Sequence, residues 1–266
     1  MSGFGDGHSL RGQVAVVTGG NQGIGAAIAT GFAGVGASIV IAARTEESLS
    51  EMAQRLNDFG ADCLPVQCDV TDERSVAVLG ESVLKRFSRV DVVVANAGVA
   101  GPTALMHTIS YEQWRECMAI DLDGVFLTFR QFIPHMLERG RGCLIAISSM
   151  TGKRPLYGRT PYATAKMGVI GLVRTLAHEL GPSGIRVNAI CPGAVDGPRI
   201  EAVIERQAAI QGVSIEAARA QLIGPSALKR LVAPEEVAAA CVFIASPAAA
   251  SITGEDLNVT AGVVMY

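Results

Sequence analysis

The chain has 266 residues, of which 49% are hydrophobic and 18% are charged, so the composition predicts one large globular domain and not a disordered chain. A formal net charge of −3, without a basic run and with only 5% aromatic residues, argues against nucleic-acid binding. No apolar run is long enough to cross a bilayer, so no membrane partner is expected. Residues 1–12 are Gly-rich and polar, and we expect a flexible tail before a single domain over 13–266.

The six cysteines are spread along the chain and never form a Cys-x-x-Cys pair. A zinc site needs such paired spacings, so no metal site is predicted. Most of the cysteines lie within apolar segments, which indicates buried free thiols and a cytoplasmic location. The four histidines are scattered and are interpreted as surface or packing residues.

The first predicted strand begins at Val14 and runs directly into a glycine-rich turn. Its glycines would permit positive φ, a close approach to a phosphate, and tight packing of a helix over 26–35. Free N–H groups at the start of that helix would face a pyrophosphate, although the same kind of turn also occurs without a ligand. The cofactor-binding residues expected here are Gly19, Asn21, Gln22, Gly23, Ile24 and Gly25.

The second predicted strand, 38–43, ends at Ala43 and is followed by Arg44. Dinucleotide-binding folds that select NAD place a carboxylate near this position to hold the ribose 2′-hydroxyl. A guanidinium group would instead pair with a 2′-phosphate. The sequence therefore favours NADP(H), with NAD(H) as the alternative cofactor and an exposed loop charge as the alternative interpretation of Arg44.

The next segments alternate helix and strand, which is typical of a parallel, doubly wound sheet. Asp69 follows the third strand and is expected either to accept a hydrogen bond from an adenine amino group or to cap the next helix. Ligands of such sheets lie at the carboxyl ends of the strands, so a cofactor is expected to border Asp69, Val70, Asn96, Ala97 and Gly98. The elements predicted here are helices over 46–59 and 71–87 and strands over 61–66 and 90–95.

The second half of the chain is predicted to add three strands and to cover them with helices. Pro192 and Gly193 end the sixth strand, and a loop leads from the fifth strand to Tyr162. Residues 194–231 are interpreted as an irregular to helical substrate-loop insertion that covers the sheet edge. The elements predicted are a helix over 110–138 bent near Gly124 and Pro134, a strand over 143–148, a helix over 162–180, a strand over 185–190, a helix over 233–245 and a strand over 256–259.

Tyr162 and Lys166 are four residues apart, which places both side chains on one face of the predicted helix. A phenol has a pKa of about 10 and is a poor base at neutral pH, and a neighbouring ammonium group favours its ionised form. Such a pair can donate or remove a proton at an alcohol oxygen, and Ser149 at a strand end can hydrogen-bond the same oxygen. Taken alone, this spacing is also common by chance, as a surface aromatic beside a surface charge.

Taken together and in order, five motifs resemble the short-chain dehydrogenase/reductase family over essentially the whole chain beyond the tail. The motifs are Thr18-Gly19-x3-Gly23-Ile24-Gly25, Asn96-Ala97-Gly98, Ser149, Tyr162-x3-Lys166 and Pro192-Gly193. The resemblance implies an α/β fold: a Rossmann-type, doubly wound sheet of about seven parallel strands in the order 3-2-1-4-5-6-7, with helices on both faces. It also implies a homotetramer, or a homodimer, whose contact uses helices 110–138 and 161–180.

The resemblance further implies hydride transfer between a nicotinamide dinucleotide and a small-molecule secondary alcohol or ketone, with 3-oxoacyl compounds among the substrates. Tyr162 would be the acid/base and Ser149 would polarise the substrate oxygen. Lys166 would lower the tyrosine pKa and hold the nicotinamide ribose. Pro192, Gly193 and Val195 would also contact the cofactor.

Three positions depart from the family's usual pattern. Asp121 replaces an asparagine that helps to hold a water of the proton relay behind the lysine, and an ionised aspartate cannot donate a hydrogen bond. Gly197 stands where a threonine usually contacts the nicotinamide carboxamide, so this contact is expected from the main chain of Val195. The run 259–262, Val-Thr-Ala-Gly, replaces a common Asp-Gly-Gly ending, and no functional cost is expected.

Two other classes of function are left as alternatives. A non-catalytic dinucleotide-binding sensor or assembly protein is supported only by Asp121 and Gly197, and it predicts that Tyr162→Phe leaves its role intact. An epimerase or dehydratase of the related longer-chain class would need a separate substrate domain, which the length of the chain does not provide.

The substrate pocket is expected from segments 100–108, 150–160 and 194–231, which are mostly apolar. Its predicted lining comprises Met150, Leu156, Tyr157, Ile200 and Ile204. An anionic group would find four cations in these segments, but ordinary loop charges are the preferred interpretation of Lys153, Arg154, Arg159 and Arg199.

Overall fold

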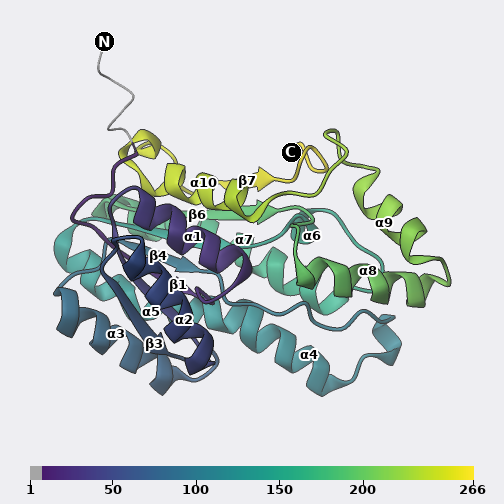
Figure 1. Ribbon diagram of the computed structural model, residues 1–266, viewed down its shortest axis with the longest axis horizontal. Coiled ribbons are helices and arrows are strands. Elements are labelled where there is room, and N and C mark those ends of the chain that lie inside the picture. Colours follow the sequence, from purple (N-terminus) through teal and green to yellow (C-terminus); the bar gives the residue numbers. More distant parts are fainter. Residues whose placement is uncertain (1–7) are drawn as a thin grey trace, which may run out of the picture.

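The computed structural model describes residues 8–266, and its centre is a sheet of seven parallel strands (Figure 1). The strand order is β3-β2-β1-β4-β5-β6-β7, which confirms the predicted doubly wound topology. The chain reverses its direction of winding between β1 and β4, and this switch point is where open α/β sheets bind ligands. The strands are β1 (Val14–Thr18), β2 (Ser38–Ala43), β3 (Cys63–Gln67), β4 (Val92–Ala95), β5 (Gly142–Ile147), β6 (Ile185–Pro192) and β7 (Asp256–Val259).

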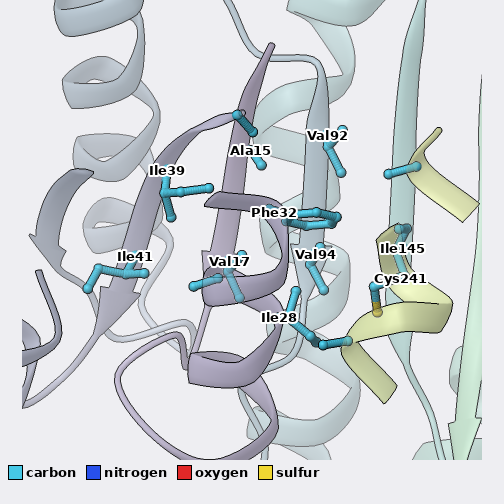
Figure 2. Packing of buried hydrophobic residues seen from close by; sticks show 14 of the residues in the cluster. Ala15, Val17, Ile28, Phe32, Ile39, Ile41, Val92, Val94, Ile145 and Cys241 are labelled. Atoms are coloured by element: carbon cyan, nitrogen blue, oxygen red, sulfur yellow. The ribbon is translucent and has the colours of Figure 1, made fainter. Parts of the chain in front are cut away.

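The central strands are apolar on both faces because helices cover both sides of the sheet. All five residues of β1 are buried, and the four apolar ones alternate between two hydrophobic cores. Figure 2 shows one of these cores, in which Ile28 and Phe32 lie over Val17 and Val94, with Cys241 beside them. The helices on this face are α1 (Gly23–Gly34), α2 (Glu46–Asp58) and α10 (Pro234–Ala245), and those on the other are α3 (Glu73–Phe87), α5 (Gly124–Arg139) and α7 (Thr160–Leu180).

The long helix predicted over 110–138 is interrupted once, at residues 119–123 and not at Pro134. It consists of α4 (Tyr111–Met118), a turn of π-helix at Ala119–Asp123 and then α5, which continues through Pro134 to Arg139. A π turn adds a residue to the helical turn and is often found at functional sites. Here it carries Asp121, whose side chain is completely buried.

Helices lie in two further segments, of which one was expected to be a loop and the other irregular to helical. A short helix, α6 (Met150–Lys153), begins after Ser149, whose Oγ accepts a hydrogen bond from Thr151 N at 3.1 Å. Residues 194–231 contain α8 (Pro198–Gln211) and α9 (Ile215–Ile223). Both helices contribute to a pocket at the carboxyl ends of the strands, so this segment covers those ends.

The prediction of a flexible tail over residues 1–12 does not hold at Leu10. Residues 1–7 of it lie outside the described residues, but Leu10 is fully buried in the core that also holds Phe32. Its backbone N–H donates to Val35 O at 3.0 Å. The packed domain therefore includes Leu10, upstream of the predicted boundary at residue 13. Within 8–266, none of the helices combines the length and the apolar character that a membrane span requires.

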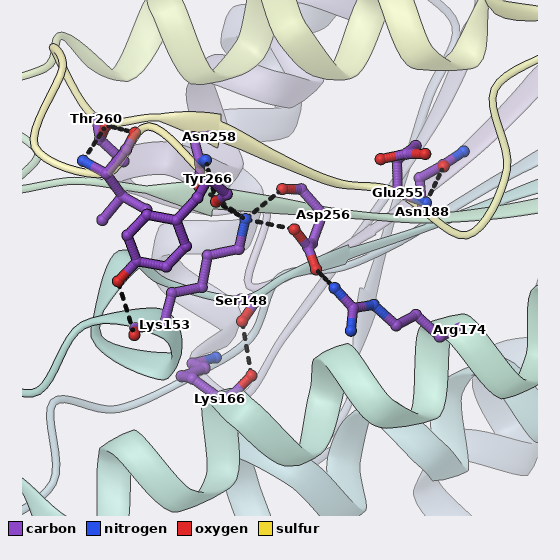
Figure 3. A network of polar contacts seen from close by, with 11 residues as sticks. Ser148, Lys153, Lys166, Arg174, Asn188, Glu255, Asp256, Asn258, Thr260 and Tyr266 are labelled. Carbon is purple, nitrogen blue, oxygen red and sulfur yellow. Dashed lines mark hydrogen bonds and ion pairs between the residues drawn. The ribbon is translucent and has the colours of Figure 1, made fainter.

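A polar network of hydrogen bonds and ion pairs joins the C-terminal residues to β7 and α6 (Figure 3). The Lys153 ammonium group donates to Asp256 O at 2.7 Å and to Asn258 Oδ1 at 2.9 Å, and it also forms an ion pair with the Asp256 carboxylate. Arg174 donates to the same carboxylate at 2.6 Å. The charge of Lys153 is therefore already matched within the fold.

Candidate active site

The glycine turn after β1 is held against the end of β4 by polar contacts. Thr18 Oγ1 accepts hydrogen bonds from the backbone N–H groups of Asn96, at 3.0 Å, and Ala97, at 3.1 Å. Asn96 Nδ2 donates in return to Thr18 O at 2.9 Å. A Cβ atom at Gly25 would lie only 2.0 Å from Gly19 O, so this position requires glycine. The sequence motif included Thr18, but it did not indicate that its hydroxyl joins the two strand ends.

Helix α1 begins at Gly23, three residues earlier than predicted, so the last two glycines of the motif lie in its first turn. Gln22 is the N-cap but makes no side-chain capping bond, and the first turn contains no acidic residue. Its N–H groups therefore lack side-chain acceptors, and together with the helix dipole they favour an anion such as a pyrophosphate.

A cavity of about 530 Å³ lies at the carboxyl ends of the strands, a volume typical of small-molecule sites. It brings together every predicted cofactor-binding residue except Gly193. Gly193 instead permits close packing, because its Cβ would lie 2.9 Å from Thr260 Cα. The predicted residues that line the cavity are Gly19, Asn21, Gln22, Gly23, Ile24, Gly25, Arg44, Asp69, Val70, Asn96, Ala97, Gly98, Tyr162, Lys166, Pro192 and Val195.

Two charged residues lie at the β2 and β3 side of this cavity. The Arg44 side chain is exposed, and among residues 8–266 its guanidinium group has no hydrogen-bond partner. Asp69 does not cap α3, since Asp72 is the N-cap and accepts from Arg74 N at 3.0 Å. Asp69 Oδ1 accepts instead from the backbone and hydroxyl of Thr71, and the backbone bond is the main reason that the Asp69 pKa lies below its usual range.

Ser149, Tyr162 and Lys166, which were predicted to be catalytic, lie on the wall of the same cavity. Lys166 is only 3% exposed, and its Nζ donates to Ile147 O at 3.0 Å. The same Nζ lies 5.6 Å from the centre of the Tyr162 ring. Ser148, next to Ser149, donates to Lys166 O at 2.7 Å and so ties the end of β5 to α7 (Figure 3).

Asp121, the fourth predicted catalytic residue, lies behind Lys166 and does not line the cavity. Its Oδ1 is 3.0 Å from Lys166 Nζ, and its Oδ2 accepts weakly from Val99 N at 3.4 Å. Burial is the largest single influence on the pKa of Lys166 and lowers it, but Asp121 and Tyr162 together raise that pKa above its usual value. Burial, with a smaller contribution from Asp121, raises the pKa of the neighbouring Cys117 thiol to about 12. Asp121 thus contacts the cavity wall from behind, through Lys166 and the backbone of Val99.

The predicted substrate lining is only partly found. Met150, Leu156 and Ile200 line the large cavity, whereas Ile204 lines a smaller one of about 70 Å³ beside it. Tyr157 is 54% exposed and lines neither. Other lining residues were not named individually, although all but Val99 lie in the segments predicted to form the pocket: Val99, Ala100, Thr151, Val203 and Leu222.

The backbone conformation bears on two of the three departures from the family pattern. It explains the first of them, and it carries a conformational cost at the second. Gly197 has φ +136°, a conformation that disfavours residues with a Cβ atom, and least suits a β-branched threonine. Ala261 has φ +51°, a value that glycine adopts more readily than alanine.

The matching family model, described as enoyl-(acyl carrier protein) reductase, covers residues 19–264. A cis-4-hydroxycyclohexanecarboxylate dehydrogenase of Sinomonas cyclohexanicum is 39% identical over 96% of this chain and 98% of the relative. The chain belongs to the short-chain dehydrogenase/reductase family. A second relative in this family, the 3-oxoacyl-[acyl-carrier-protein] reductase of Thermotoga maritima, is 32% identical over 96% of this chain and 99% of its own length.

Solved structures of the family are similar to this chain over nearly its whole length. An actinorhodin polyketide ketoreductase with NADPH has a TM-score of 0.91 and 35% identity, covering 96% of this chain and 98% of its own. An NAD⁺-bound xylitol dehydrogenase has a TM-score of 0.92 and 28% identity, covering 95% and 99%. The chain is a short-chain alcohol dehydrogenase or carbonyl reductase, acting between CH–OH and carbonyl with a nicotinamide dinucleotide.

Proposed function

We propose that Tyr162 moves the proton in this reaction, with Ser149 hydrogen-bonded to the substrate oxygen and Lys166 favouring the ionised phenol. The observation that carries the proposal is that these three side chains line one cavity with the glycine turn. In reduction, Tyr162 donates its phenolic proton to the carbonyl oxygen as negative charge develops there, and in alcohol oxidation it accepts the proton. Asp121 is a positioning residue, because it contacts Lys166 and lies outside the cavity.

The cavity also fits the cofactor, and each part of its wall has an expected role. The first turn of α1 would hold the pyrophosphate, Asp69 and Val70 would border the adenine, and Asn96 to Gly98 would lie along the middle of the dinucleotide. Lys166 would hold the nicotinamide ribose, while Pro192 and Val195 would border the nicotinamide. The bound nicotinamide supplies or accepts the hydride.

The substrate that we propose is a secondary alcohol or the corresponding ketone. The named relatives are a cis-4-hydroxycyclohexanecarboxylate dehydrogenase and a 3-oxoacyl-[acyl-carrier-protein] reductase, so both a cyclic and a linear carbonyl compound belong in the first assay. Met150, Leu156 and Ile200 give the cavity an apolar lining that suits either carbon skeleton.

The experiment that tests this proposal is a turnover assay with purified protein. NADPH, and separately NADH, would be mixed with cyclic ketones, cyclic diketones and 3-oxoacyl thioesters, and cofactor oxidation would be followed by absorbance. We expect consumption of NADPH with at least one class. Tight binding of the dinucleotide without turnover of any compound would favour the non-catalytic sensor or assembly protein that Gly197 and Asp121 first suggested.

Arg44 is proposed to select NADP(H), because an exposed guanidinium without a partner lies where a 2′-phosphate would be held. Hydrogen bonds to a charged group contribute about 1.5–3 kcal/mol, so Arg44→Ala should raise the KM for NADPH by about 10–100-fold. The KM for NADH should change by less than about threefold, since NADH lacks the phosphate. Arg55→Ala, which removes an exposed arginine of α2 away from the cavity, is the control. Equal losses for both cofactors would contradict the assignment.

We further propose a single domain whose substrate segment is 194–231, assembled as a homotetramer or a homodimer. Two exposed apolar side chains support the assembly, Phe126 on α5 and Met167 on α7, because these helices are the ones that the family uses as an interface. Light scattering after gel filtration would measure the state. The six free cysteines support a cytoplasmic location, where thiols stay reduced.

A further inference from the structure

The sequence places four cations near the substrate pocket, and in the structure one of them differs from the rest in its burial and its charge pairing. Lys153 is paired with Asp256, and Arg154 and Arg199 are exposed. Arg199 also donates to Gly98 O at 2.7 Å. Arg159 is only 4% exposed, so it is not the ordinary loop charge that the sequence suggested.

The guanidinium group of Arg159 lies beside Tyr162, on the wall of the same cavity. Its Cζ is 4.7 Å from the centre of the Tyr162 ring, and its Nη2 donates to Ala100 O at 2.5 Å. Its other two nitrogens, Nε and Nη1, are buried and have no acceptor among residues 8–266. The side chain therefore keeps unused hydrogen-bond donors within a side chain's length of the reacting phenol.

No carboxylate of the described chain is available to balance this charge. Arg159 appears in none of the ion pairs between residues 8 and 266, and Asp121, the carboxylate that acts on its pKa, is already bound to Lys166. Burial, which dominates, lowers the pKa of Arg159, with Arg206 adding a small repulsion, although Tyr162, Cys117 and Asp121 act in the opposite direction. Burying a charge without a partner is costly, so an incoming anion would gain strongly from meeting it.

A second unpartnered donor lies in the adjoining loop. Thr103 Oγ1 is buried without a hydrogen-bond partner within 8–266. Its loop is joined to the loop of Arg159 by the hydrogen bond from Ala104 N to Gly158 O, at 2.9 Å. Apart from Asp121 Oδ1, which pairs with Lys166, the unpartnered buried side-chain atoms of the described chain all belong to these two loops. Both loops lie in segments that the sequence assigned to the substrate.

We propose that Arg159 binds a carboxylate of the substrate, so that the enzyme acts on an oxo acid and the matching hydroxy acid. A planar guanidinium group matches a carboxylate in shape and in charge, and one positive charge meets one negative charge. Because Arg159 stacks on Tyr162, the carboxylate and the reacting carbonyl are separated by only a few carbon atoms. This inference rests on the proposed function and names its substrate class.

The carboxylate takes no part in the bond changes. One hydride and one proton add across the C=O group, a C–H bond and an O–H bond form, and NADPH is oxidised to NADP⁺. Arg159 holds the far end of the substrate so that its carbonyl lies at Tyr162. Removing this contact should therefore act mainly on KM, whereas loss of a proton donor acts mainly on kcat.

The test compares each acid with its neutral methyl ester, using 4-oxocyclohexanecarboxylate and linear oxo acids of different lengths. Arg159→Gln should lower kcat/KM for the acid by about 10–100-fold, chiefly through KM, and change that for the ester by less than about threefold. Arg159→Lys, which keeps the charge but not the fork, should lie between the two. Arg55→Gln, which changes an exposed arginine of α2 away from both cavities, should leave the ratio of acid to ester unchanged. Equal losses for acid and ester in Arg159→Gln would overturn the proposal.

A binding measurement makes the result independent of turnover. In the presence of NADP⁺, cyclohexanecarboxylate should raise the Tm of the wild type more than cyclohexylmethanol does, and Arg159→Gln should abolish the difference. If no ketone is turned over but this difference is found, the proposed reaction fails and the carboxylate site stands. If ketones are turned over but the acid gives no extra shift, the carboxylate site fails alone. A larger shift with cyclohexylphosphonate than with the carboxylate would also overturn the assignment to carboxylates.

Discussion

Replacing Tyr162 with phenylalanine is expected to lower kcat by about 10²–10⁴-fold, the usual contribution of a positioned acid or base. The change removes one oxygen and keeps the ring, which packs against the Arg159 guanidinium group and lies 5.6 Å from Lys166 Nζ. The fold and the cofactor site should therefore be unaffected. NADPH fluorescence titration should give a Kd within about twofold of the wild type, while steady-state kinetics reports the loss of kcat.

Tyr157→Phe is the matched control for this change. Tyr157 lies five residues earlier, is 54% exposed and lines neither cavity, so removing its hydroxyl should leave kcat unchanged. If Tyr162→Phe kept more than about a tenth of the activity, another group would have to supply the proton. That result would contradict the role assigned to Tyr162, because a tenfold change corresponds to only about 1.4 kcal/mol of transition-state stabilisation.

The parallel strands and the glycine turn could be predicted because their signals are local. A strand such as β1, buried at every position, must be apolar throughout, and a tight turn that approaches β4 needs glycine. The convergence of Ser149, Tyr162 and Lys166 followed from strand ends and helical spacing. These features depend on neighbours in sequence, or on the rule that parallel strands meet at one edge.

Features that depend on distant packing could not be predicted. The pairing of Asp121 with Lys166 joins residues 45 positions apart, and it requires a π turn that no residue pattern marks. Arg159 follows a glycine in a predicted loop, where an ordinary loop charge was the preferred interpretation, yet it is buried beside Tyr162. The charge balance of the site is therefore a property of the tertiary structure.

Removing the ammonium group of Lys166 is expected to lower both stability and activity. In Lys166→Met the Asp121 carboxylate would remain fully buried, with only the weak contacts from Val99 N and Cys117 Sγ. Breaking a buried ion pair in this way costs about 3–5 kcal/mol of unfolding free energy. Urea denaturation measures this loss, and turnover should fall with it because Tyr162 loses its neighbouring cation.

The double variant Lys166→Met/Asp121→Asn separates these two effects. Replacing the unpaired Asp121 carboxylate with an uncharged amide should restore most of the unfolding free energy, since the amide is far less costly to bury. It should restore none of the turnover, because the cation beside the phenol is still missing. If the double variant were as unstable as Lys166→Met, packing of the lysine stem and its bond to Ile147 O would account for the loss, and not the charge of Asp121.

The pH dependence of the single variant distinguishes the same two explanations. In the wild type the pKa of Lys166 is raised, so its stabilising contribution is complete below the ordinary lysine value and is lost only as the pH rises through the higher value of the folded chain. Lysine titration therefore adds no pH dependence between about pH 5 and 8. The difference in unfolding free energy between the wild type and Lys166→Met should accordingly stay constant from pH 5 to pH 8 and shrink as the pH rises through the raised pKa of Lys166. A difference that did not shrink at high pH would show that packing of the lysine stem, and not its charge, causes the loss.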